Sequence, residues 1–243
     1  MLENYLVLSY LCFIIALQSC AGVGVLVLGT PFLLILDYTI IEILLILLPI
    51  SIVTSFVNLL IMKLSNKEMV LVTFKGLAKF FIACVPSIII GLFILKYYKD
   101  YINFKILVSL IIFFSILLIT FKDKISFRIN FFRFSILSIV GIIHGLTNSG
   151  GTLMSLVLSN NKQKLDARYS ITFFYLLLAL IQYIITLIIF QNSFFFPEEV
   201  NFILILVFGI LMGNILIKLL SENKYKLLIN FLAITSSVIL FFS

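Results

Sequence analysis

Two short clusters of glycine and small polar residues could together bind a small anion. Their hydroxyl and amide groups donate hydrogen bonds without a fixed positive charge, and glycine lets a ligand approach the backbone N–H groups closely. A buried lysine at the same place would be costly in a membrane and would hold an anion too tightly for easy release. Close packing of helices also uses small residues, so packing is the alternative for both clusters. The first cluster consists of Gly22, Gly24, Gly29, Thr30 and Pro31, and the second of Thr147, Asn148, Ser149, Gly150, Gly151 and Thr152.

Further polar residues near the clusters could line a path or move a proton. His144 is the only histidine, and it could couple transport to protons because imidazole titrates near physiological pH. The alternative is a neutral ring that is hydrogen-bonded to a helix backbone. Arg168 could attract an anion to a gate, or it could anchor a helix at a membrane surface. Four residues on one helical face could line the path or bond neighbouring helices, and Gln182 is a lone candidate of the same kind. These four are Ser51, Thr54, Ser55 and Asn58.

The elements that carry these residues are hydrophobic segments of the length that crosses a membrane. Hydrophobic residues make up 63% of the 243-residue chain and charged residues 11%, which is far from the balance of a soluble domain. Most of the eight segments approach the ~20 residues that span a bilayer, but the two that carry the clusters are longer. We therefore expect an all-α integral membrane protein with one polytopic domain, 1–243. The segments are roughly 5–36, 40–62, 69–95, 102–121, 131–158, 169–190, 200–220 and 225–242.

The placement of lysine and arginine favours hairpins for the first and fifth segments. If all eight segments cross, the 17 cations divide almost evenly between the two sides. Suppose instead that 5–36 and 131–158 each return to the membrane face from which they entered, without crossing. Then all the lysines and arginines except Lys96, Lys99 and Lys105 lie on one side of the membrane, which would be cytoplasmic. The halves, about 1–121 and 122–243, then form an inverted repeat. In support, Gly29-Thr30 and Gly151-Thr152 match at a spacing of 122 residues. The alternative is a tilted or broken helix that still crosses.

Few residues could serve an enzyme, a cofactor or a metal ion. One histidine and three cysteines within apolar runs cannot form a His-rich or Cys-rich metal site. Acidic residues lie mostly in loops, and no P-loop is present. We therefore predict a protein that is not an enzyme, with no cofactor and no metal. The net charge of +7 comes from cations that flank hydrophobic segments, so it does not indicate binding of nucleic acid. The oligomeric state is left open.

Glycine-rich stretches occur at Gly22-Val23-Gly24, at Gly29-Thr30-Pro31 and at Gly145–Gly151, and two further features are the basic run Lys164–Arg168 and the spacing Gly209–Gly213. This arrangement resembles the sulfite exporter TauE/SafE family of bacterial membrane transporters over nearly the whole chain. The resemblance implies a multi-pass protein of the bacterial inner membrane, in contact with lipid, that exports or imports small sulfur-containing anions. Coupling to protons or to another ion, or uncoupled passage, is expected, because ATP would have to come from a partner. A transporter of another small organic acid and an integral membrane enzyme are the alternatives.

Overall fold

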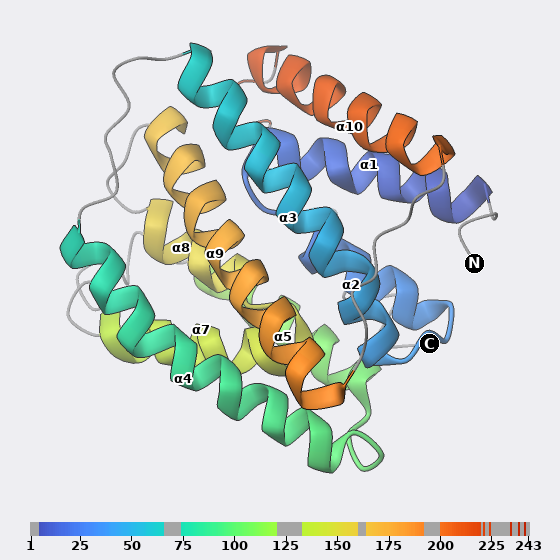
Figure 1. Ribbon diagram of the computed structural model, residues 1–243, viewed down its shortest axis with the longest axis vertical. Coiled ribbons are helices and arrows are strands. Elements are labelled where there is room, and N and C mark those ends of the chain that lie inside the picture. Colours follow the sequence, from blue (N-terminus) through green and yellow to red (C-terminus); the bar gives the residue numbers. More distant parts are fainter. Residues whose placement is uncertain are drawn as a thin grey trace.

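The computed structural model describes residues 5–65, 74–120, 133–159, 164–191 and 200–219, with isolated positions beyond 219. Every element in these ranges is an α-helix (Figure 1), which agrees with the expected all-α class. The eighth hydrophobic segment, 225–242, lies outside the described residues apart from isolated positions. The helices are α1 (Tyr5–Ala21), α2 (Val25–Ile35), α3 (Ile40–Ser65), α4 (Phe74–Tyr98), α5 (Phe104–Thr120), α7 (Arg133–Thr147), α8 (Gly151–Ser159), α9 (Lys164–Phe190) and α10 (Val200–Leu219).

Four of the described helices are long and apolar enough to cross a bilayer. They are α3, α4, α9 and α10, and each contains at least 18 residues with few charges. The other described helices are shorter, and four of these are the arms of the two interrupted segments. The hydrophobic length of the chain is therefore divided between long single helices and pairs of short ones.

The first interrupted segment folds back on itself as a hairpin. The ring of Tyr10 in α1 stacks on Phe32 in α2 with a centroid distance of 3.7 Å, and the Tyr10 hydroxyl donates to the Leu28 carbonyl at 3.1 Å. In one straight helix, residues 10 and 32 would lie about 33 Å apart. The reversal occurs at Gly22, whose φ of 84° is a left-handed conformation that glycine adopts without strain.

The second interrupted segment reverses in the same way. Asn148 follows α7 with a φ of 65°, and asparagine is one of the few non-glycine residues that visit this conformation readily. Gly150 then lies against α7, because a Cβ added there would be 2.6 Å from the carbonyl oxygen of Val140 and 2.8 Å from Cβ of His144. Helix α8 therefore starts beside the end of α7.

The two hairpins occupy corresponding places in the helical arrangement. Helices α3 and α9 pack against one another in the middle of the molecule, with α4 and α7 on one side and α1 and α10 on the other (Figure 1). The first arm of each hairpin thus packs on a long helix from the other half of the chain. Glycine makes both contacts close: Gly91 meets the backbone of α7 at Ile142, and Gly213 meets the backbone of α1 at Ala16.

The expected pairing of Gly29 with Gly151 is wrong in register. Gly29 lies inside α2, where it packs against Leu47 and Ile14, whereas Gly151 is the first residue of α8. The residues in equivalent places are Gly22 and Asn148, which both have positive φ. Apolar helices permit many alignments by chance, so the spacing of two glycines did not determine the register.

Candidate functional site

The two interruptions meet in the interior of the protein. Asn148 Nδ2 donates to Thr30 Oγ1 across the two hairpins at 3.4 Å, which is a long hydrogen bond. Val23 lies beside Gly151, since a Cβ on Gly151 would be 2.9 Å from Val23 Cγ2. Thr30 and Asn148 are both fully buried. The structure therefore brings together residues that are more than a hundred positions apart, as the polar clusters indicated.

The N-terminus of α2 is capped by a side chain from α1. Gly24, the N-cap residue, has no side chain to offer, and the Val25 N–H donates instead to Gln18 Oε1 at 3.0 Å. The Gln18 amide nitrogen is within 3.1 Å of Ser51 Oγ and 3.0 Å of Ser55 Oγ in α3. These contacts favour interhelical bonding as the role of Ser51 and Ser55, and they fix the first turn of α2 against α3.

Arg168 holds the end of α1 through a buried network. Its guanidinium donates to the Ser19 carbonyl and to Asn214 Oδ1 at 2.9 Å. Asn214 Nδ2 donates to Asn58 Oδ1 at 2.8 Å, and Asn58 Nδ2 donates to Ser19 Oγ at 3.0 Å. A cation near the C-terminal carbonyls of a helix is favourable for the helix dipole. Arg168 is only 6% exposed, so it is not an ordinary anchor at the membrane surface.

Several hydroxyl groups predicted as ligand donors already donate to nearby carbonyls. Thr30 Oγ1 donates to Leu26 O at 2.7 Å, Thr147 Oγ1 to Ile143 O at 2.8 Å, and Ser149 Oγ to Thr147 O at 3.2 Å. Their protons are therefore engaged within the hairpins. Pro31 lies inside α2. Thr152 is in the first turn of α8, and its side chain lies outside the described part.

His144 is fully buried in the last turn of α7. Neither of its ring nitrogens has a hydrogen-bond partner among the described residues, which does not agree with a ring hydrogen-bonded to a helix backbone. Its own carbonyl accepts from the Asn148 N–H at 2.9 Å and from Gln182 Nε2 at 2.8 Å. Gln182 therefore ties α9 to the end of α7.

One face of α9 carries polar residues that sequence reasoning did not connect. Their separations of three, four and seven residues repeat on one helical face, and all five side chains are buried. This spacing was visible in the sequence, but only the packing of α9 against both hairpins shows that the face is internal. Asn214 in α10 was also missed, because the spacing noted in the sequence ends at Gly213, one residue before it. The residues on the α9 face are Arg168, Thr172, Tyr175, Gln182 and Thr186.

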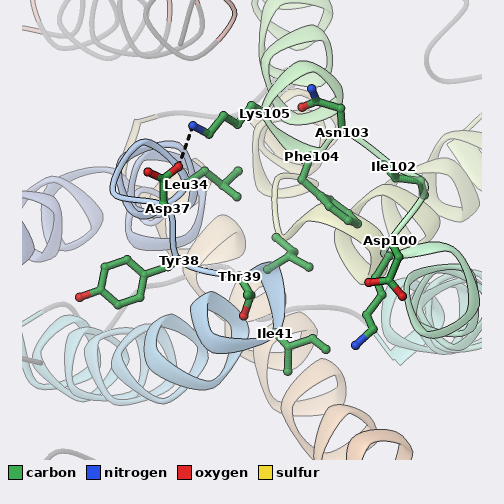
Figure 2. A pocket seen from close by; sticks show the side chains of 12 residues that line it. Leu34, Asp37, Tyr38, Thr39, Ile41, Asp100, Ile102, Asn103, Phe104 and Lys105 are labelled. Atoms are coloured by element: carbon green, nitrogen blue, oxygen red, sulfur yellow. Dashed lines mark hydrogen bonds and ion pairs between the residues drawn. The ribbon is translucent and has the colours of Figure 1, made fainter.

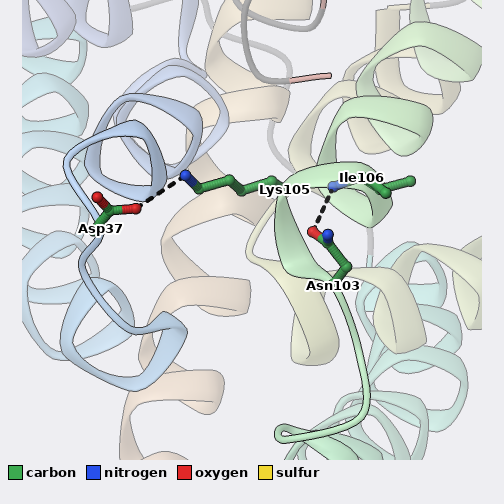
Figure 3. Close-up of polar contacts among 4 residues, drawn as sticks. All are labelled: Asp37, Asn103, Lys105 and Ile106. Carbon is green, nitrogen blue, oxygen red and sulfur yellow. Dashed lines mark hydrogen bonds and ion pairs between the residues drawn. The ribbon is translucent and has the colours of Figure 1, made fainter. Parts of the chain in front are cut away.

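A surface pocket of about 490 Å³ lies at the far end of α2, between the α2–α3 turn and the α4–α5 turn (Figure 2). Lys105 Nζ and Asp37 Oδ1 form an ion pair of 2.9 Å beside it (Figure 3). The Ile106 N–H donates to Asn103 Oδ1 at 3.2 Å, and this bond caps the start of α5. No predicted binding residue lines this pocket. Because the Asp37 side chain is 83% exposed, the ion pair adds little to stability.

Comparison with known proteins identifies the family. A family model described as Sulfite exporter TauE/SafE matches residues 7–240, which is nearly the whole chain. No curated protein and no solved structure matches the chain. The match agrees with the long apolar helices α3, α4, α9 and α10, which are suited to an integral membrane protein. The chain therefore belongs to the sulfite exporter TauE/SafE family of membrane transporters.

Proposed function

We propose that this protein moves small sulfur-containing oxyanions or organosulfonates across the bacterial inner membrane, and that the anion binds where the two hairpins meet. The observation that carries the proposal is the contact between the interruptions, at Asn148–Thr30 and at Gly151–Val23. Interrupted helices at corresponding places of two halves are a frequent form of transport site.

The chemistry of the meeting point suits a weakly held anion. Helices α2 and α8 both begin there, and a helix leaves its first N–H groups without intrahelical acceptors. Each N-terminus also carries about half a positive charge from the helix dipole. Such partial charges attract an anion without the strong retention of a direct ion pair, so release on the other side remains fast.

The hairpins would enter the bilayer from opposite faces as re-entrant elements. The antiparallel packing of α1 and α2, from Tyr10 on Phe32, supports this for the first hairpin. In this topology Asp37 and the N-terminus share the outer face, and most lysines and arginines are cytoplasmic. A cysteine at Asp37 that reacts with an impermeant reagent only from the cytoplasm would contradict the arrangement.

The function is tested by flux into proteoliposomes that contain the purified full-length protein. Radiolabelled sulfite, thiosulfate, a sulfonate and a small carboxylate are supplied separately, with protein-free liposomes as the control. We expect saturable flux of the sulfur compounds, and a pH gradient should change its rate if protons are coupled. Saturable flux of the carboxylate alone would assign the protein to organic acids instead, and the absence of flux for every anion would refute the proposal.

A further inference from the structure

Tyr175 joins the two interruptions from the middle of α9. It is fully buried and is among the largest buried side chains of the described residues. A Cβ on Gly151 would collide with the edge of its ring, so the ring packs directly on the start of α8. The ring centroid is 6.1 Å from that of His144.

The hydroxyl of Tyr175 points at the other hairpin. It lies beside the backbone N–H groups of Leu26 and Gly24 at the start of α2, but it has no hydrogen bond of acceptable geometry with any described residue. The neighbouring Val25 N–H is already accepted by Gln18. The first N–H groups of a helix have no intrahelical acceptors.

Three donors thus face one region: the phenol O–H and the N–H groups of Gly24 and Leu26. A phenol oxygen can accept from an N–H group, but the phenol proton itself needs an acceptor, and none is present among the described residues. A buried hydroxyl without such a partner is destabilising by roughly 1–3 kcal/mol. A small oxyanion has several acceptor oxygens and no donor group that needs a partner of its own. It is therefore a suitable ligand for these three donors. The dipole of α2 adds positive potential at the same place.

We propose that the Tyr175 hydroxyl donates a hydrogen bond to the bound oxyanion and makes Tyr175 a specificity-determining residue of the site. This inference rests on the proposed function and names a residue on α9, outside both glycine-rich clusters. The phenol is uncharged, so it selects for acceptor oxygens without holding the anion by a full charge. Its rigid ring also fixes the distance between the start of α2 and the start of α8.

The test compares Tyr175→Phe with Tyr183→Phe in full-length protein reconstituted at equal amounts. Tyr183 is a matched control because it is also a buried tyrosine of α9. Hydrogen bonds to charged groups are the stronger class, so we expect Tyr175→Phe to raise the half-saturating sulfite concentration roughly ten- to a hundredfold. Tyr183→Phe should leave it within about threefold, and the melting temperature of Tyr175→Phe should not fall, since no protein hydrogen bond is lost.

The outcomes separate this inference from the proposed function. If the wild-type protein moves no anion, the proposed function fails. If the wild type moves sulfite and a folded Tyr175→Phe saturates at the same concentration, only the role of Tyr175 is overturned. Should Tyr175→Phe be poorly folded, 3-fluorotyrosine placed at position 175 keeps the side chain. Its fluorine resonance must then shift on addition of sulfite, and an unchanged resonance at saturating sulfite overturns the inference.

Discussion

Asn148 combines a backbone role and a side-chain role, and three substitutions can separate them. Its φ is 65°, and its amide reaches Thr30 through a bond of 3.4 Å. A residue other than glycine pays about 1–2 kcal/mol in the left-handed conformation, with asparagine at the lower end. The long hydrogen bond is worth about 0.6 kcal/mol by the average for membrane proteins. Asn148→Gly should therefore leave the melting temperature nearly unchanged, whereas Asn148→Ala should lower stability by about 1–2 kcal/mol.

The effect on transport should follow the amide and not the backbone. If the amide turns from Thr30 to the anion, its loss removes a hydrogen bond to a charged group, about 1.5–3 kcal/mol, or roughly ten- to a hundredfold in affinity. Asn148→Gly and Asn148→Ala should thus raise the half-saturating sulfite concentration alike, despite their different stabilities. Asn148→Asp should nearly abolish flux, because a carboxylate repels the anion. The measurements are thermal unfolding in detergent and flux in proteoliposomes. A stable Asn148→Gly with wild-type saturation would refute this account of the amide.

Three further predictions concern the groups that support the site. Gln18→Leu removes the cap on Val25 and the bonds to α3, so thermal unfolding should show a loss of about 2–4 kcal/mol; a loss below about 0.5 kcal/mol would mean that water replaces the amide. Arg168→Lys should lower stability by about 1–3 kcal/mol, because an ammonium cannot reproduce the planar donor set that binds Ser19 and Asn214. If flux falls while stability is unchanged, Arg168 acts on the anion instead. His144→Gln should keep sulfite binding but flatten the dependence of flux on pH, and an unchanged pH profile in proteoliposomes would remove the coupling role.

The hairpins were predictable because each of the two segments is too long for one crossing and contains glycine and polar residues near its middle. A bilayer accepts about 20 residues per crossing, and the first segment continues to Leu36 with a glycine at position 22 and another at position 24. Freed backbone groups persist in a membrane protein only where other protein groups or a cavity satisfy them. The hydrogen bond from the Val25 N–H to Gln18 Oε1 follows this rule. The convergence of the two interruptions then followed from their corresponding places in the two halves.

The register and the identity of the bonding partners could not be predicted from one sequence. Gly29 and Gly151 matched in spacing but not in structure, because helical segments tolerate shifts of a turn with little change in apolar pattern. Ser51 was recognised as part of a polar face, yet its partner Gln18 lies in another helix. In the sequence, Tyr175 is one of several aromatic residues in an apolar segment, and nothing there distinguishes it. Its importance depends on how α9 is rotated against both hairpins, and that rotation is a property of the packed structure.

The two hairpins differ at equivalent positions, which are occupied by Gln18 in the first and His144 in the second. In each hairpin, the residue with positive φ bonds through its N–H to a carbonyl four residues earlier: Gly22 to Gln18 and Asn148 to His144. The Gln18 side chain accepts from the Val25 N–H at the start of α2 and donates to Ser55 Oγ in α3. Neither ring nitrogen of His144 has a partner among the described residues. The described groups that hold the first hairpin at this point are the Gln18 amide and the Arg168 guanidinium, and neither titrates near physiological pH. The second hairpin has the imidazole of His144 at the same point. We therefore propose that any coupling to protons acts through His144 in the second hairpin, and the pH dependence of flux in His144→Gln discriminates between coupled and uncoupled transport.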